Sequence, residues 1–238
     1  MAEQLPHPVL APEVRPSTGL PGVRKARKGK MPTEIWNTFG EEFRSLRTRV
    51  AAALNERHKS VLVTSALPQE GKTTVSSTLA RSFAQMEWRT LLVDADMRKP
   101  TMHAIFGIDR APGLTDLFQG HVPEEDAIAA TNSPHLDLLS AGSPSQAVAE
   151  LLQSAATPAL LKSLAARYDY VVVDSPPLTS ITDRLLLAGY VDGILFVVNG
   201  LVSPRELVKS AREQLHDRPV LGVVLNGIST PKKYGYYY

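Results

Sequence analysis

The chain has 238 residues, 43% hydrophobic and 21% charged, with a formal net charge of +2. These values are those of an ordinary globular protein, large enough to build one sizeable α/β domain without disulfides or a structural metal. The absence of cysteine excludes a disulfide framework, a thiol nucleophile and a thiolate metal site. The six histidines have no ligand spacing, so we also expect no metal held by protein side chains alone.

Residues 1–32 are rich in proline and in basic side chains, and we expect a disordered arm there. Residues 1–30 hold six Lys or Arg against two Glu, and they lack the apolar core of a signal peptide. The arm could be a solvated segment only. It could also contact anionic lipid or an acidic partner, at about 1 kcal/mol per basic residue near a membrane surface.

A folded domain is predicted for residues 33–229, and it begins with a helix from Glu34 to about Glu56 that Thr33 can cap. Apolar side chains recur in this helix at steps of three or four and form one stripe: Phe39, Phe43, Leu46, Val50 and Leu54.

Glu41, Arg44 and Arg47 sit three apart near one edge of this helix, off the apolar stripe. Read by themselves, they are most simply local pairs on a solvated face, worth about 0.2–0.5 kcal/mol each.

The rest of the domain alternates short apolar runs with helical patterns. The predicted strands are 60–66, 90–96, 136–141, 170–174, 193–198 and 220–226, and the predicted helices are 72–87, 146–167, 180–189 and 204–216. This alternation predicts an α/β fold: a doubly wound, mostly parallel sheet covered on both faces. We expect ligands at the carboxyl ends of its strands.

The apolar segment 185–202 raises the question of a membrane span. Asp192 lies at its middle, where a charge would cost about 2.5–3.5 kcal/mol in a bilayer. A buried helix followed by a buried strand is therefore the better interpretation.

The stretch "ALPQEGKT" (66–73) follows the first strand of the domain and has the spacing of a P-loop, with Ala66 in place of the first glycine. Gly71 lets the backbone approach a phosphate, Lys72 reaches the β- and γ-phosphates, and the Thr73 hydroxyl can ligate Mg²⁺. The stretch therefore predicts a P-loop NTPase, with the nucleotide bound by Gln69, Glu70, Gly71, Lys72, Thr73 and Thr74.

Two further strands end in carboxylates that should lie beside this loop. Asp94 and Asp96 follow the apolar run "TLLV", and Asp174 ends "YVVVD", the Walker B pattern that holds Mg²⁺. Each alone could equally be a helix cap or a turn residue, but three carboxylates at one sheet edge predict a site. Asn226, at the end of the last strand, could offer its amide to adenine, although Asn-Gly is also a common turn.

The P-loop, "DADMRKP" and "VVVDSPP" resemble the MinD/ParA class of P-loop ATPases. That class has a signature lysine at the place of Leu67. This departure and the terminal "YGYYY" make the chain similar to the bacterial tyrosine kinases of capsule and exopolysaccharide systems. The stretch "EEFRSLR" fits that family's E-x-x-R-x-x-R pattern, and the likeness covers residues 33–238.

The resemblance implies an ATP- and Mg²⁺-dependent tyrosine kinase domain at 33–229 and a flexible substrate tail at 230–238. It implies catalytic roles for Lys72, Asp94 and Asp96, with Asp94 favoured as acceptor of the phenol proton and Asp96 assisting; the residues alone do not order these two. Thr73, Asp94 and Asp174 would hold the metal. The phosphorylated side chains would be Tyr234, Tyr236, Tyr237 and Tyr238, and the subunit contacts Glu41, Arg44 and Arg47.

As partners, the resemblance implies a ring-like homo-oligomer, a separate transmembrane polysaccharide co-polymerase adaptor and a tyrosine phosphatase, with no nucleic acid. The expected location is cytoplasmic, on the inner face of the cell membrane through the adaptor. Two other functions remain open. One is a positioning ATPase, against which Leu67 and the tyrosine tail count; the other is a nucleotide-gated scaffold without useful catalysis.

Overall fold

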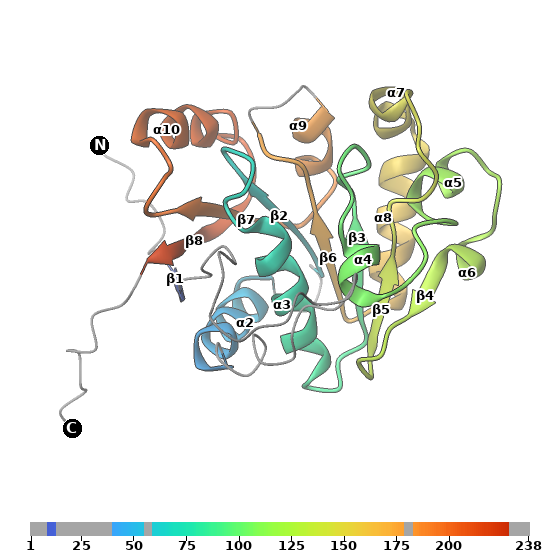
Figure 1. The fold of residues 1–238 in the computed structure, drawn as a ribbon, viewed down its shortest axis with the longest axis horizontal. Coiled ribbons are helices and arrows are strands. Elements are labelled where there is room, and N and C mark those ends of the chain that lie inside the picture. The colour runs from blue at the N-terminus through green and yellow to red at the C-terminus, as the bar shows by residue number, and fades with distance from the viewer. Residues whose placement is uncertain (1–8, 13–39, 55–58, 179–182, 229–238) are drawn as a thin grey trace, which may run out of the picture.

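A computed structural model describes residues 9–12, 40–54, 59–178 and 183–228. In these ranges one mostly parallel sheet runs in the order β1-β8-β7-β2-β6-β3-β5-β4 (Figure 1). The strands are β1 (Val9–Pro12), β2 (Ser60–Ser65), β3 (Thr90–Asp94), β4 (Ile128–Ala130), β5 (Leu136–Leu139), β6 (Tyr170–Asp174), β7 (Gly193–Asn199) and β8 (Val220–Ile228). Only the β4–β5 pair of the described sheet is antiparallel.

Helices cover both faces of this sheet (Figure 1). One face packs against α2 (Gly40–Leu54), α3 (Lys72–Ala84) and α4 (Met102–Phe106). The other packs against α5 (Leu114–Phe118), α6 (Glu124–Ala127), α7 (Val148–Gln153), α8 (Ala156–Arg167), α9 (Asp183–Ala188) and α10 (Arg205–Glu213). The predicted doubly wound α/β fold is thus confirmed, and its central strands β2 and β3 are buried throughout because neither face meets water.

The strand order places a topological switch point at β2. The chain passes from β2 through α3 to β3 on one side, whereas β7 and β8 lie on the other side. The carboxyl end of β2 therefore opens between β6 and β7, where α/β sheets of this kind bind their ligands.

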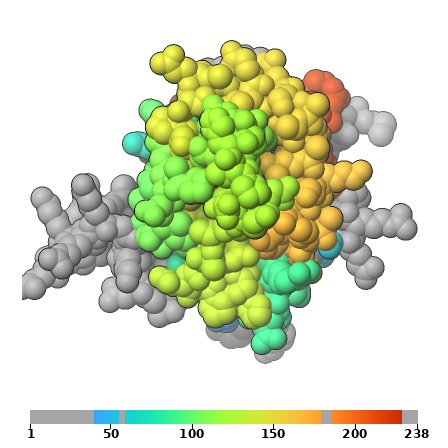
Figure 2. Space-filling view, turned by 90° about the vertical axis from the view of Figure 1, so that its right-hand side faces the viewer, coloured from blue at the N-terminus to red at the C-terminus, as the bar shows by residue number. Residues whose placement is uncertain are grey.

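The structure departs from the sequence expectations at the two edges of the sheet. Residues 9–12, inside the segment expected to be a disordered arm, form β1 and pair in parallel with β8. The rest of that arm lies outside the described residues. At the other edge β4 was not predicted, because three residues carry too little pattern. Figure 2 views this end of the molecule, where residues of about 100–165 form the central part of the surface.

The helix predicted over 146–167 is two helices. Ser154 has an extended backbone, and its hydroxyl accepts a hydrogen bond from the Ala156 amide at 3.0 Å, as at the start of a new helix. A continuous helix would also need an amide hydrogen at Pro158, which proline lacks. The chain therefore breaks between α7 and α8.

The segment 185–202 does not form a membrane helix. Its described part gives the end of α9 and the strand β7, as expected. Within the described ranges no helix combines the length and the apolar character needed to cross a membrane.

Candidate active site

The loop between β2 and α3 has the backbone of a phosphate-binding loop. Gln69 and Gly71 both have left-handed backbones, with φ of 63° and 94°. A Cβ at Gly71 would lie 2.1 Å from Nδ2 of Asn226, so a larger residue would clash there as well as strain the backbone. Helix α3 begins at Lys72, which leaves the amides of its first turn directed at the loop.

Lys72 is the buried cation of this site, with 8% of its surface exposed. Burial lowers the pKa of Lys72, and the charges of Asp174, Asp96 and Glu70 act in the opposite direction. An ammonium group that is partly stripped of water and surrounded by carboxylates is prepared to receive a polyanion.

Asp174 ends β6 beneath the first turn of α3. Its Oδ2 accepts a hydrogen bond from the Thr73 hydroxyl at 2.8 Å, and its Oδ1 accepts one from Ser76 at 2.6 Å. Burial raises the pKa of Asp174 to about 6, although these two hydrogen bonds and Lys72 act to lower it. The Thr73 hydroxyl and the Asp174 carboxylate, the pair predicted to hold Mg²⁺, therefore already lie in contact.

Asp94 is the direct neighbour of Asp174 across the β3–β6 pair. Its Oδ2 accepts hydrogen bonds from the amides of Thr101 and Met102 at 3.2 and 3.1 Å, which fixes the carboxyl group beside the start of α4. Burial raises the pKa of Asp94 to about 8, and the charge of Asp174 adds to this rise. Two adjacent buried carboxyl groups thus form the floor of the site.

Asp96 follows Asp94 by two residues, beyond the end of β3, and is only partly buried. Its amide donates to Oδ1 of Asp94 at 3.3 Å, and its own Oδ1 accepts from the Lys99 amide at 3.0 Å. Its charge acts on Lys72, Asp94 and Asp174 alike. The three carboxylates predicted from separate strand ends therefore do converge.

Asn226 lies against the phosphate loop, and this changes the expectation that its amide is presented to adenine. Its Nδ2 donates to the Glu70 carbonyl at 2.9 Å, whereas its Oδ1 is buried without a hydrogen-bond partner among the described residues. A role for the amide nitrogen in holding the loop is thus directly visible; a contact with adenine stays a prediction.

The donor set fits a magnesium–nucleotide complex. Mg²⁺ keeps several waters and is usually bound by one or two carboxylates or hydroxyls together with substrate phosphates. Thr73 and Asp174 supply this kind of set beside Lys72, with Asp94 adjacent. Within the described ranges no three His, Asp or Glu side chains form a cage for a metal ion.

Among the remaining predicted residues, Gln69 is exposed, Thr74 is half-buried and the Glu70 side chain is buried. Tyr234, Tyr236, Tyr237 and Tyr238 lie outside the described residues. Sequence reasoning missed Ser76, although its place four residues after Lys72 puts it one turn along the same helix face. It also missed the Thr101 and Met102 amides, for which the sequence holds no signal.

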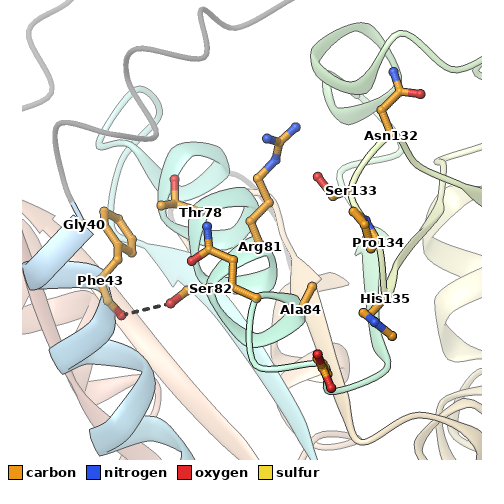
Figure 3. Close-up of a pocket in the computed structure, with 12 residues that line it drawn as sticks. Gly40, Phe43, Thr78, Arg81, Ser82, Ala84, Asn132, Ser133, Pro134 and His135 are labelled. Atoms are coloured by element: carbon orange, nitrogen blue, oxygen red, sulfur yellow. Dashed lines mark hydrogen bonds between the residues drawn. The ribbon is translucent and has the colours of Figure 1, made fainter.

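A separate cavity of about 450 Å³ lies away from this site (Figure 3). It opens between α2, the carboxyl-terminal half of α3 and the turn before β5. Arg81 and Ser82 line it from α3, and Asn132 and His135 face them from the turn. Helix α3 starts at the phosphate loop, and this cavity lies beside its other end, near the amino-terminal ends of the strands. It therefore takes no part in the candidate active site.

The pKa values of the floor predict how stability depends on pH. The folded-state pKa of Asp94, about 8, lies above its unfolded value near 3.9, so the folded protein keeps a proton that the unfolded chain releases. Its contribution to stability is full below about pH 4 and is lost as the pH rises through about 8. Without nucleotide or Mg²⁺, the free energy of unfolding should fall by about 1 kcal/mol per pH unit from roughly pH 6.5 to 8.

Urea unfolding in EDTA at several pH values measures this slope. Asp94→Asn should flatten it, whereas Asp137→Asn, a partly exposed aspartate on β5, serves as the control and should not. An unchanged slope in Asp94→Asn would show that this group does not hold the proton.

The fold and the phosphate loop together are those of a P-loop NTPase. A family model for the AAA domain matches residues 69–199. The MinD septum site-determining protein of Pyrococcus horikoshii, solved with Mg-ADP, has the same fold with a TM-score of 0.61. It is 24% identical, and the match covers 74% of this chain and 71% of that one.

Closer relatives identify the branch. The tyrosine-protein kinase YwqD of Bacillus subtilis is 36% identical over 221 residues, which is 91% of this chain and 93% of that protein. The crystal structure of the chimerical protein CapA2B2 matches with a TM-score of 0.77 and 34% identity, covering 81% of this chain and 86% of that one. The chain belongs to the bacterial tyrosine kinases.

Proposed function

We propose that this kinase uses ATP and Mg²⁺ to phosphorylate its own C-terminal tyrosines, Tyr234, Tyr236, Tyr237 and Tyr238, between subunits of a homo-oligomer. The observation that carries the proposal is the convergence of Lys72, the Thr73–Asp174 pair and Asp94 at one sheet edge. Four of the last five residues are tyrosine, and they follow β8, whose carboxyl end lies at this same edge.

Phosphoryl transfer leaves positioning and charge stabilisation as the work of the protein. The first-turn amides of α3 and the Lys72 ammonium hold the β- and γ-phosphates. Thr73 and Asp174, with Asp94 beside them, would hold Mg²⁺, which when bound neutralises charge on the phosphates. Asn226, whose Oδ1 has no hydrogen-bond partner among the described residues, is the residue proposed to face the amino group of adenine.

Asp94 is proposed to accept the proton of the incoming phenol, with Asp96 assisting. The phenol oxygen forms a bond to the γ-phosphorus, the bond from that phosphorus to the β–γ bridging oxygen breaks, ADP leaves, and the proton moves to the Asp94 carboxylate. A phenol with a pKa of about 10 needs such an acceptor. Cationic charge bound beside Asp94 would favour its ionised form and so enable it to accept.

The proposed consequence is control of polysaccharide polymerisation and export through assembly. Each phosphate adds about 1.5–2 negative charges, so a modified tail would be repelled by Asp94, Asp96 and Asp174. Modification would then weaken the docking that produced it. The proposal also includes a separate membrane adaptor, a tyrosine phosphatase and a place on the inner face of the membrane.

One incubation with Mg²⁺ and ATP labelled at the γ-phosphate tests the proposal. We expect phosphotyrosine on the protein. ADP and free phosphate without phosphotyrosine would support a positioning ATPase, and neither product would support a nucleotide-gated scaffold.

The proposed subunit contact on α2 needs a distinction that the structure supplies. Glu41 and Arg44 are exposed, but Arg47 is half-buried and its Nη1 donates to the Ser82 carbonyl on α3 at 3.0 Å. Arg47 therefore already has a task within its own chain, which is to fasten α2 to α3. Only Glu41 and Arg44 are left facing outward for a neighbour.

Separate alanine variants should divide these roles. Arg44→Ala should lower the mass of the oligomer and the autophosphorylation rate without changing the unfolding temperature. Arg47→Ala should instead cost about 1–2 kcal/mol of stability, because the Ser82 carbonyl loses its donor. Light scattering and thermal unfolding measure both effects, with exposed Arg49→Ala on the same helix as the control. An unchanged oligomer mass for Arg44→Ala would show that this edge of α2 is a solvated face and not a subunit contact.

A further inference from the structure

Glu70 is a buried carboxylate within a loop whose expected ligand is a polyanion. It is 1% exposed, and carboxylates are almost never so buried unless they are paired. A negative charge at this place opposes the binding of phosphates, since like charges repel strongly in a partly dry site. Its contacts must therefore serve the site in another way.

The Glu70 side chain fastens the loop at two points. Its Oε2 accepts a hydrogen bond from the amide of Leu67, at the start of the loop, at 2.6 Å. Its Oε1 accepts one from the hydroxyl of Ser203, which comes from the connection between β7 and α10. The carboxylate thus bridges the phosphate loop to a segment 133 residues away in the sequence.

Ser203 is itself held firmly. Its amide donates to the Asn199 carbonyl at 3.0 Å, and its hydroxyl oxygen accepts from the Asn199 amide at 3.1 Å. Asn199 pairs with Asn226 across β7 and β8, and Asn226 donates to the Glu70 carbonyl. The ends of β7 and β8 therefore hold Glu70 by its side chain and by its backbone.

The backbone around Glu70 needs this support. Gln69 on one side and Gly71 on the other are both left-handed, and for a residue other than glycine this backbone costs roughly 1–2 kcal/mol. A loop with such a residue keeps its shape only if its surroundings determine it. The loop amides and Lys72, which follows directly, are placed by that shape.

We propose that Glu70 and Ser203 are positioning residues of the phosphate loop: the hydrogen bond between them holds the loop in the geometry that binds the nucleotide phosphates. Neither side chain touches the reacting atoms in this role. The inference rests on the proposed function to the extent that the loop binds a nucleotide. It adds that the affinity of this loop is set from the β7–α10 connection.

The test compares Ser203→Ala with Ser203→Thr, which keeps the hydroxyl, and with Ser210→Ala, an exposed serine on α10, as the matched control. Titration with a fluorescent ADP analogue and Mg²⁺ measures affinity, and thermal unfolding without nucleotide measures stability. Loss of a hydrogen bond to a charged group predicts roughly tenfold weaker binding for Ser203→Ala. Ser203→Thr should stay within about twofold of the wild type, and Ser210→Ala should not differ from it.

Two readouts separate positioning from a general loss of structure. In autophosphorylation assays Ser203→Ala should raise the KM for ATP while kcat at saturating ATP stays nearly constant, as for an interaction equal in ground and transition states. In a Glu70→Ala background, which removes the carboxylate oxygen that accepts the hydrogen bond from Ser203, Ser203→Ala should add little further loss.

The outcomes are distinct. If the wild type binds nucleotide and Ser203→Ala binds it equally well, the positioning role is wrong and the proposed function stands. If Ser203→Ala loses stability and affinity together and threonine restores neither, Ser203 has a structural role only, and the inference is also wrong. If the wild type binds no nucleotide, both the inference and the proposed function fail.

Discussion

Lys72→Met lowers both ATP turnover and tail phosphorylation by at least about 100-fold, while the protein still folds. Among the residues that the structure describes, Lys72 is the one buried Lys or Arg, and its charge lies in a site floored by Asp94 and Asp174. Removing one preorganised charge at a transition state of this kind costs about 3–4 kcal/mol. Methionine has a similar length and carries no desolvation cost, so the unfolding temperature should not fall.

The measurement is phosphotyrosine formation by the purified variant, together with its unfolding temperature. Lys162→Met, at an exposed position of α8, is the matched control and should keep wild-type activity. Substantial phosphotyrosine in purified Lys72→Met would remove this loop from the mechanism.

Mixing two incomplete chains restores tail phosphorylation that neither performs alone. One is full-length Lys72→Met, which has the tail but no catalysis, and the other is an active chain truncated after Thr230. We expect phosphotyrosine on the Lys72→Met chain, because in the proposed function the tail of one subunit enters the site of another. A tethered tail is present at a high effective concentration within such an assembly.

Chain length alone leaves transfer within one chain open. Tyr234 follows Asn226 by eight residues, a reach of up to about 28 Å, which could include the site of its own subunit. The proposal favours a neighbouring subunit, because a tail that turned back would have to bend sharply over its own nucleotide, whereas one that ran outward could meet the next site. Transfer within one chain would appear as an unlabelled mixture and a wild-type rate that does not depend on concentration.

The parts of this site that the sequence predicts are those set by local rules. A glycine-bounded loop between a strand and a helix, and an aspartate at the end of an apolar strand, are recognisable from neighbouring residues alone. The parallel sheet then brings Lys72, Asp94 and Asp174 to one edge without further information. Their spatial convergence was therefore predictable, although their roles in catalysis stay predictions.

The contacts that hold the loop are not predictable in this way. Ser203 and Asn226 meet Glu70 from 133 and 156 residues away, and which side-chain atom points at the loop depends on the finished packing. Arg47 shows the same limit. The spacing of Arg47 suggests an outward contact. In the structure, however, α2 packs through its apolar stripe in an orientation that directs the Arg47 guanidinium to the Ser82 carbonyl.

The most direct test of the central claim is mass spectrometry of the tail itself. Trypsin cleaves after Lys233 and releases "YGYYY" (234–238), a peptide that contains all four proposed phosphorylation sites. After incubation of the purified wild type with Mg²⁺ and ATP, this peptide should carry one or more phosphoryl groups, and the peptide from Lys72→Met should carry none. ATP consumption that leaves this peptide unmodified in the wild type would contradict the account.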